Sequence, residues 1–524
     1  MQKLHKLLKS NRAPKFFLVF IAICLGVLWR LPLFINSEFL TYSDETANHL
    51  TIKHLFTFKE IYYYYHGMRY QGLTEGLLSL FFVPFFGFSA LSQKLAGTLV
   101  YFFFTSTVFY FLKREIKSMV LKSLLVLGMI IPTTHLYVVS FMAYGGHLLN
   151  AYIGFLTLAL IYWGQALRTK NPRRFIFYFC FLVALGTYTY RHFLAFYPVI
   201  LVFLWFFRTP ARTRSRDILT SFCLPIFFMF SAPLLNRFWG TYVQSLAFEN
   251  LNSFMSFESF QFLNFSEMMQ KIPTVFGVLW PNLFFTKTLT HFEVAGIIVG
   301  VLALVFLVVL NILNWNLLTR EARLLRLSTL HVALILASTL VTPYSTLALD
   351  IRYLMPIYGV LPFFLLVAFK YFDGQKRKNY FYLLLGVGIL GNIVNTLQFN
   401  VTRGIANKNY LPQKAEVPFA DLINYLKEEK LNCIFMDYSE AYSLSLQSNE
   451  EVWASAINLK RIRRYENCAI SAQPRIIALP YGHDQLSAIL EFSLKKGIRY
   501  RVRRHLKTHV VIESYHFDPE EKTP

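Results

Sequence analysis

The sequence predicts an all-α polytopic membrane bundle followed by a small C-terminal α/β domain. Of the 524 residues, 55% are hydrophobic and only 15% are charged, whereas soluble domains carry roughly 25% charged residues. Apolar runs long enough to cross a bilayer recur from residue 16 to residue 398. The segment after residue 415 has no apolar run of this length. A membrane protein with one small soluble domain is the class that fits all three observations.

The apolar runs alternate with short basic clusters. We place the runs at 16–35, 73–90, 93–112, 119–139, 148–167, 175–190, 193–207, 218–235, 292–314, 327–346, 353–370 and 380–398. The clusters lie at Lys113–Lys117, Arg168–Arg174, Arg208–Arg216, Arg320–Arg326 and Lys376–Lys378. The apolar runs predict about 11–13 transmembrane helices, and the enrichment of Lys and Arg in cytoplasmic loops sets their orientation in the expected bacterial inner membrane. We expect an uncleaved first helix with a cytoplasmic start, and a C-terminal domain outside the cytoplasm.

The stretch 73–112 holds two apolar runs where this topology needs an odd number of crossings. Either one run is a partial or re-entrant piece, or the basic cluster at Lys113–Lys117 is not cytoplasmic. The sequence leaves both alternatives open.

The chain divides into a membrane part, 1–414, and a soluble part, 415–524. The membrane part has two long outer loops, 36–72 and 236–291, and the second is expected to form amphipathic interfacial helices. In the soluble part, helices at Phe419–Lys430 and Gln485–Lys496 are expected to alternate with strands at Cys433–Met436, Arg475–Leu479 and Val510–Glu513. An oxidised domain would allow a disulfide between Cys433 and Cys468. Two unpaired thiols fit the sequence equally well.

Charge and motifs exclude several function classes. The net charge is +23, but the cations lie in short loops between apolar runs, so a nucleic-acid partner is rejected in favour of membrane lipid. The segment Gly386–Gly391 matches a dinucleotide fingerprint, yet it lies in an apolar run without a preceding strand and fits helix packing. The sequence has neither a phosphate-binding P-loop nor an H-E-x-x-H zinc motif.

Asp44 and Glu45 are the candidate catalytic residues. These adjacent carboxylates follow the first apolar run, and ionisable groups beside a bilayer are candidates for function because they are costly to keep there. The alternative is that Asp44 caps a short interfacial helix through its carboxylate, with Glu45 in the first turn. Position alone leaves both interpretations open.

Polar side chains at the outer ends of other apolar runs are the candidate substrate-binding residues. They are Arg69, Gln71, Glu75, His147, Arg191, His192, Arg352 and Tyr353. Singly, each fits a helix cap or an interfacial anchor. Together they predict a carboxylate base surrounded by cations, as chemistry with a phosphate leaving group requires.

With these motifs the chain resembles the GT-C superfamily of polytopic glycosyltransferases. It is most similar to the bacterial branch related to protein O-mannosyltransferases and aminoarabinose transferases of lipid A. The resemblance is carried by Asp44-Glu45, Gly67–Glu75, Gly145-Gly146-His147, Arg352–Pro356 and Met436–Tyr442. In that branch the first carboxylate of the acidic pair is the usual base candidate, which corresponds to Asp44. Arg69 and Thr74 depart from the branch's commoner residues, so the acceptor or the sugar can differ.

The resemblance implies transfer of a sugar from a polyprenyl-phosphate donor to a hydroxyl acceptor of the cell envelope, with inversion. Asp44 would deprotonate the acceptor. Glu45 would orient a neighbour or contact a metal, because successive side chains point in different directions. Cofactors are unknown, and a divalent metal near Asp44 and Glu45 stays open. A transporter or flippase of lipid-linked sugars is the alternative, and it would need no acidic base. The third alternative is a non-catalytic scaffold that acts through its C-terminal domain.

Overall fold

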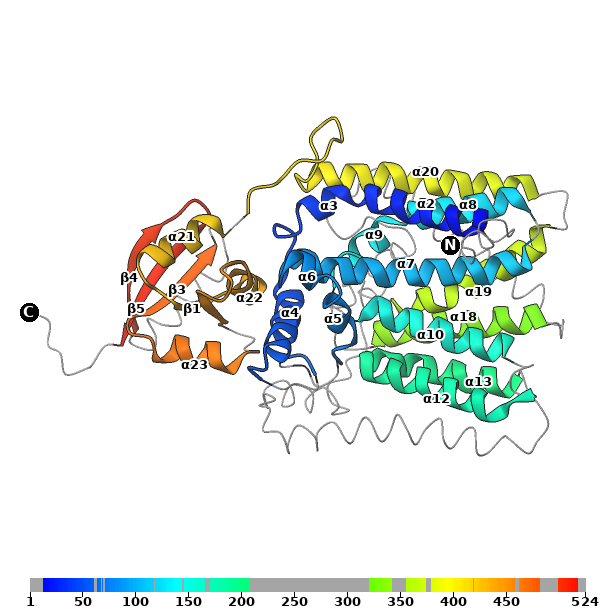
Figure 1. The fold of residues 1–524 in the computed structure, drawn as a ribbon, viewed down its shortest axis with the longest axis horizontal. Helices are drawn as coiled ribbons and strands as arrows, with labels where there is room; N and C mark the ends of the chain where they lie inside the picture. The colour runs from blue at the N-terminus through cyan, green and yellow to red at the C-terminus, as the bar shows by residue number, and fades with distance from the viewer. Residues whose placement is uncertain are drawn as a thin grey trace, which may run out of the picture.

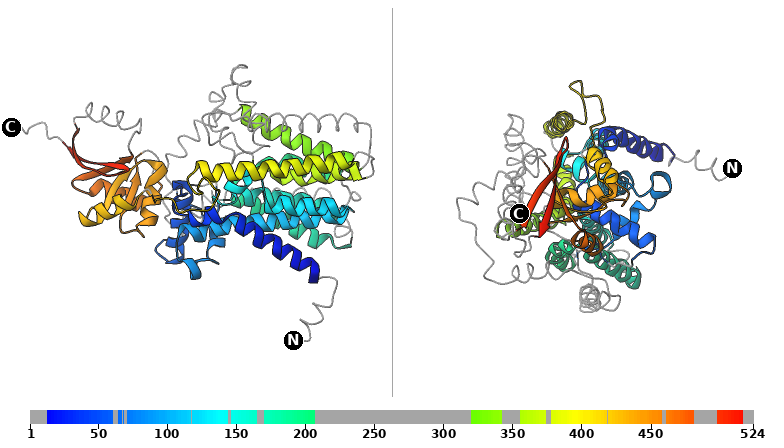
Figure 2. Two further views of the ribbon diagram at one scale, coloured as in Figure 1. Left: turned by 90° about the horizontal axis from the view of Figure 1, so that it is seen from above. Right: turned by 90° about the vertical axis from the view of Figure 1, so that its left-hand side faces the viewer.

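The computed structural model places a helical bundle beside a C-terminal α/β domain, with the short helices α4 and α5 at the junction (Figure 1). It describes residues 13–60, 64–66, 68, 71–116, 118–143, 146–164, 170–206, 320–341, 355–373, 378–417, 419–457, 461–480 and 498–516. Two perpendicular views show the C-terminal domain at one end of the bundle (Figure 2).

The bundle helices follow most of the predicted apolar runs. They are α2 (Ala13–Trp29), α3 (Leu31–Ile35), α7 (Ala90–Glu115), α8 (Met119–Ile130), α9 (Thr134–Val139), α10 (His147–Trp163), α12 (Pro172–Thr189), α13 (Tyr197–Phe206), α18 (Arg320–Val341), α19 (Pro356–Asp373) and α20 (Lys378–Thr402). Within the described residues, α7 alone is both long and apolar enough to span a membrane, and shorter apolar helices accompany it. The predicted runs at 218–235 and 292–314, and the loop 236–291, lie outside the described residues.

The ambiguous stretch 73–112 contains one long helix. The run 73–90 forms only α5 (Thr74–Ser79) and α6 (Val83–Phe86), and Gly87 ends α6 with a φ of 65°. Positive φ costs glycine little because it lacks a Cβ. The structure thus has the form of the first alternative, a single spanning helix preceded by a partial piece.

Aromatic side chains fill the core between α7, α10 and α19. The ring of Phe111 lies 5.4 Å from that of Phe155, 4.4 Å from that of Trp163 and 5.2 Å from that of Phe363, centroid to centroid. Aromatic pairs contribute about 0.5–1.5 kcal/mol each beyond their buried area. This packing accounts for part of the high Phe and Tyr content of the chain.

The C-terminal domain contains a five-stranded mixed sheet of order β2-β1-β3-β5-β4. Its strands are β1 (Cys433–Met436), β2 (Trp453–Ala456), β3 (Arg475–Pro480), β4 (Ile498–His505) and β5 (His509–His516). Strand β1 pairs in parallel with β2 and β3, and β5 runs antiparallel to β3 and β4. The described helices are α21 (Ala420–Glu428), α22 (Tyr438–Gln447) and α23 (Arg463–Ser471). The predicted α/β class is confirmed, and the helix expected at Gln485–Lys496 lies outside the described residues.

A disulfide joins Cys433 on β1 to Cys468 on α23, with the two Cα atoms 5.6 Å apart. The sequence left this pairing open, and the structure decides it. The bond ties a central strand to a helix that packs on β1 and β2.

The C-terminal domain shares its core with a helix of the segment 36–72, the predicted first outer loop. Helix α4 (Ser43–Phe56) packs on α22, and its Ala47 and Leu50 are fully buried in the same hydrophobic cluster as Tyr442 and Leu444. The hydrophobic core of the C-terminal domain therefore includes residues from before the predicted boundary at residue 415. Because Asp44 and Glu45 lie in the first turn of α4, this packing fixes the acidic pair at the junction.

Candidate active site

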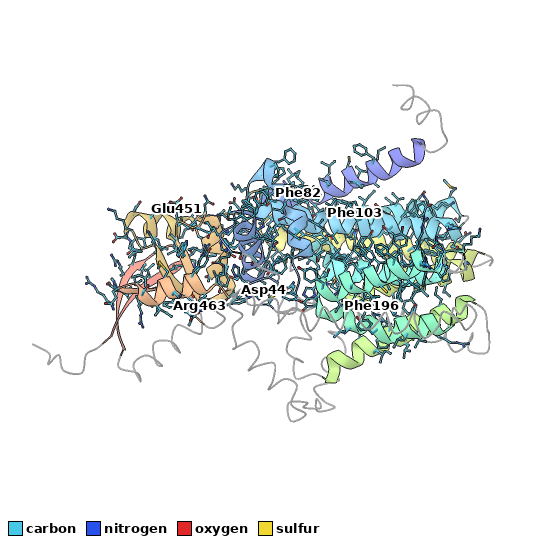
Figure 3. The ribbon with its side chains drawn as sticks, turned by 60° about the horizontal axis from the view of Figure 1, so that its bottom comes forward. Asp44, Phe82, Phe103, Phe196, Glu451 and Arg463 are labelled. Atoms are coloured by element: carbon cyan, nitrogen blue, oxygen red, sulfur yellow. A yellow bond between two sulfur atoms is a disulfide. The ribbon has the colours of Figure 1, made fainter. Side chains whose placement is uncertain are left out.

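Asp44 lies at the junction between the bundle and the C-terminal domain (Figure 3). Its Oδ1 accepts hydrogen bonds from the Tyr438 hydroxyl and the Arg461 guanidinium. The Asp44 side chain is 17% exposed and that of Arg461 10%. The N-cap residue of α4 is Tyr42, which makes no side-chain capping bond. The Asp44 carboxylate is therefore held by the C-terminal domain, and the helix-cap alternative for it does not apply.

Tyr438 is a hydrogen-bond donor to Asp44 over the physiological pH range. Burial raises the pKa of Tyr438 well above its ordinary value, with Arg461 opposing and Asp44 reinforcing that shift. The phenol consequently keeps its proton. The guanidinium of Arg461 also lies over the Tyr438 ring, 5.2 Å from its centroid. The three side chains form one polar group in which a carboxylate is held by a phenol and a cation.

Glu45 points away from Asp44, into the bundle. Its two carboxylate oxygens lie 3.0 and 2.8 Å from the Lys94 Nζ atom, and one of them accepts a 3.2 Å bond from the Ala143 backbone N–H. The Lys94 ammonium also donates to the Leu40 carbonyl oxygen, at 2.8 Å. Glu45 is 1% exposed and Lys94 is fully buried. This carboxylate forms a buried ion pair that joins α4 to α7.

The acidic pair does not form a shared metal site. Asp44 is bonded to the cation Arg461, and Glu45 is bonded to the cation Lys94. Two carboxylates that face different cations do not converge on one ion. Divalent-metal binding between these two residues is therefore not supported.

The segment that includes Gln71 and Glu75 docks on the end of α12. Gln71 forms a β-bridge with Tyr190, and the Thr74 and Thr189 hydroxyls lie 3.0 Å apart. The Gly72 N–H donates to the Tyr188 carbonyl at 2.9 Å. Backbone and side-chain bonds thus hold Gln71 and Glu75 beside the first residues of the 3₁₀ helix η1 (Arg191–Phe196).

Glu75 and His147 meet at the start of α10. The Glu75 carboxylate accepts a hydrogen bond from the Gly146 N–H, and it is 3% exposed. Gly146 is the N-cap residue of α10 and has a φ of 103°, a conformation that favours glycine. His147 begins the helix, and its ring lies 4.3 Å from that of Tyr190, centroid to centroid.

Two buried carboxylates hold the same connection between α9 and α10. Glu45 accepts from Ala143, and Glu75 accepts from Gly146. The Gln93 amide donates at 2.7 Å to the Glu45 carbonyl and at 3.4 Å to that of Ala143. Glu45 and Glu75 therefore fix the backbone that presents His147.

The structure brings together part of the predicted site. Asp44, Glu45, Gln71, Glu75 and His147 lie around the junction, as their contacts above describe. Arg191 and His192 are described by their backbone alone, as the first residues of η1. Arg69, Arg352 and Tyr353 lie outside the described residues, so they remain predictions.

Sequence reasoning missed three residues that contact the acidic pair. Lys94 is a lone cation in an apolar run, and an intramembrane charge is itself a signal that a partner exists. Tyr438 lies in the motif Met436–Tyr442, to which the sequence assigned no chemistry. Arg461 carries no local signal, because only the packing of α4 on the C-terminal domain brings it to Asp44.

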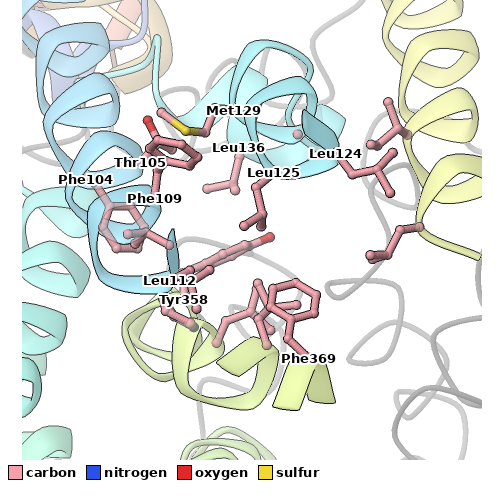
Figure 4. Close-up of a pocket in the computed structure, with 17 residues that line it drawn as sticks. Phe104, Thr105, Phe109, Leu112, Leu124, Leu125, Met129, Leu136, Tyr358 and Phe369 are labelled. Atoms are coloured by element: carbon pink, nitrogen blue, oxygen red, sulfur yellow. The ribbon is translucent and has the colours of Figure 1, made fainter. Parts of the chain in front are cut away.

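An apolar pocket lies within the bundle, between α7, α8, α19 and α20 (Figure 4). Its volume is about 230 Å³. The lining is almost wholly hydrocarbon and includes Phe104, Leu125, Leu361 and Phe369. Neither Tyr438 nor Arg461 lines it. This pocket suits an aliphatic chain, and Thr105 and Tyr358 contribute hydroxyl groups to its lining.

The sequence matches no family model and no curated protein. The fold matches the crystal structure of ArnT from Cupriavidus metallidurans bound to undecaprenyl phosphate, with a TM-score of 0.58. The match covers 96% of this chain and 98% of that chain, at 10% sequence identity. The apo-state structure of ArnT matches with a TM-score of 0.45 at 12% identity, over the same shares of both chains. The predicted resemblance to the aminoarabinose-transferase branch of the GT-C superfamily is thus confirmed at the level of fold, and the chain has the fold of ArnT.

Proposed function

We propose that this chain is a membrane glycosyltransferase that moves a sugar from a polyprenyl-phosphate donor to a hydroxyl acceptor of the cell envelope. The observation that carries the proposal is the different setting of the two acidic residues. Asp44 keeps partial exposure at the junction, whereas Glu45 is sealed against Lys94. Only the first carboxylate is placed to take a proton from a substrate.

The reaction is a single displacement. Asp44 accepts the proton of the acceptor hydroxyl as the acceptor oxygen bonds to the anomeric carbon. The bond between that carbon and the phosphate oxygen breaks, and polyprenyl phosphate leaves with the electron pair. The anomeric configuration inverts because one displacement occurs. A positioned base contributes about 10²–10⁴-fold to such a step.

The other residues have assigned parts in this proposal. Glu45 and Glu75 act as positioning residues, since they hold the backbone before His147. Arg461 compensates the charge of Asp44 until the substrates bind. Gln71, His147, Arg191 and His192 contact the sugar and phosphate, and Arg69, Arg352 and Tyr353 hold the leaving phosphate by charge-assisted hydrogen bonds.

Three further observations support a lipid-linked donor at the outer face of a bacterial inner membrane. The solved protein that shares the fold was crystallised with undecaprenyl phosphate. The pocket between α7, α8, α19 and α20 suits an aliphatic chain. The Cys433–Cys468 disulfide is typical of an oxidising compartment, which supports an extracytoplasmic C-terminal domain.

The test is transfer by the purified full-length chain in liposomes that contain a polyprenyl-phosphate donor with a labelled sugar. Envelope lipids, glycans and proteins serve as acceptors. The proposal predicts labelled acceptor and an equal amount of released polyprenyl phosphate. A flippase would move the intact donor between leaflets without breaking its bond to the sugar, and that outcome would replace the proposal with the transport alternative.

A further inference from the structure

A second polar cluster lies at the other end of α4, about 15 Å from Asp44 along the helix axis. It contains His54 in the last turn of α4, Glu60 just beyond it, and His66. His54 and His66 are buried, and Glu60 is half-buried. The ligand atoms of these three side chains all lie within 4.8 Å of one another. The proposed transfer reaction makes no use of this cluster.

Glu450 of the C-terminal domain is a polar partner of His54. The Glu450 Oε1 atom lies 2.9 Å from His54 Nε2, and it also accepts from the Tyr465 hydroxyl at 2.9 Å and from Arg464. Arg464 also contacts His54 Nε2. The His54–Glu450 contact is a hydrogen bond when the His54 proton is on Nε2. In that tautomer the Nδ1 lone pair of His54 points toward His66.

The Nδ1 atom of His54 lies 3.2 Å from Nε2 of His66. Two nitrogen ligands 2.0–2.1 Å from a tetrahedral zinc ion lie about 3.3–3.4 Å apart. The observed separation therefore accommodates either one shared proton or one metal ion between the rings. The His54–Glu450 contact favours the metal, because a metal-bound histidine usually donates its other ring N–H to a carboxylate.

The donor set suits zinc better than magnesium or calcium. Two imidazoles and one carboxylate make a His₂Glu set of the kind zinc accepts, with a fourth position for water. Magnesium and calcium prefer oxygen ligands. The nearby cations Lys53, Lys59 and Arg464 all lie within 3.9 Å of Glu450, and Arg464 also contacts His54. They compensate the charge of Glu450.

We propose that His54, His66 and Glu60 bind one zinc ion, with Glu450 as the outer carboxylate that orients His54. The ion joins the end of α4 to the segment that follows it, next to the C-terminal domain. Its role is to fix this junction.

The test uses the full-length protein in detergent, stripped with a chelator and reloaded with zinc. Mass spectrometry after gel filtration should find one zinc per chain, and zinc should raise the thermal midpoint. His66→Ala should weaken zinc binding at least tenfold and abolish the thermal shift. Glu450→Gln removes no ligand and should weaken binding by about 10–100-fold.

His509→Ala is the matched control, because His509 is a buried histidine 3.1 Å from the Glu440 carboxylate. It should bind zinc like the wild type. Cobalt added to the stripped wild-type protein should give the visible spectrum of a tetrahedral site, a readout that does not depend on any variant folding. Absence of zinc and of that spectrum from the wild type, or equal zinc binding in His66→Ala, would show that the two rings only share a proton.

Discussion

At the scale of single residues, the acidic pair shows how two neighbours acquire different chemistry. Asp44 and Glu45 are consecutive in the first turn of α4, so their side chains leave the helix in different directions. One meets Tyr438 and Arg461, and the other meets Lys94. The sequence predicted the divergence but not the partners. Arg461 lies 417 positions from Asp44 in the chain, and no local pattern relates residues at that separation.

Breaking the ion pair of Glu45 with Lys94 should destabilise the junction. Removing one partner of a buried pair costs about 3–5 kcal/mol, because it leaves the other charge uncompensated. Glu45→Gln should therefore lower the thermal midpoint strongly, whereas Glu428→Gln, at an exposed position of α21, should not. The double variant Glu45→Gln/Lys94→Met should recover part of the loss. A Glu45→Gln protein with wild-type stability would contradict this account of the pair.

At the scale of elements, prediction succeeded where periodicity and burial coincide. The strands β1, β3 and β5 and helix α21 were anticipated because each has an apolar pattern of its own. Strand β4 was missed because its sequence, Ile498–His505, is dominated by arginine. Its place at the edge of the sheet accounts for this composition, since edge strands often carry charge that prevents further pairing. The packing of α4 in the soluble core was also missed, because its apolar residues are few.

Helix α4 should make the protein sensitive to acid through His49. Complete burial lowers the pKa of His49 to about 3, with Lys53 adding to the shift. Below pH 6.5 the unfolded chain binds a proton at this residue and the folded chain does not, so stability falls as the pH falls. The uptake of one proton by the unfolded chain lowers the free energy of unfolding by about 1.4 kcal/mol for each pH unit.

The substitution His49→Gln removes the side chain that takes up this proton in the unfolded chain. The variant should show a flatter dependence of the thermal midpoint on pH between 7.5 and 5 than the wild type, as measured by fluorescence unfolding in detergent. Parallel curves for the two proteins would mean that His49 titrates alike in the folded and unfolded states.

At the scale of the whole molecule, the bundle and the C-terminal domain meet through α4, and the candidate site lies where they meet. Composition and charge placement were enough to predict both parts, because a bilayer and a soluble core select very different residues. They could not predict the contact between the parts. That contact depends on the packing of α4 on α22, to which residues distant in the sequence contribute.

The proposed topology places the C-terminus outside the cytoplasm. A reporter enzyme that is active only outside the cytoplasm, fused after Thr523, should be active, and the same reporter placed in the basic cluster Arg168–Arg174 should be silent. The reason is the bias of Lys and Arg toward the cytoplasmic face. The reverse pattern of activities would invert the topology and remove the proposed site from the outer face.

The most direct test of the central claim is the transfer rate of Asp44→Asn. This change keeps the size of the side chain and removes its basicity, so turnover should fall by about 10²–10⁴ while donor binding persists. Asp421→Asn, an exposed change in α21, is the control and should transfer sugar normally. Single-turnover transfer from the polyprenyl-phosphate donor should show the loss in the chemical step. Near-normal transfer by a folded Asp44→Asn protein would contradict the assignment of Asp44 as the base.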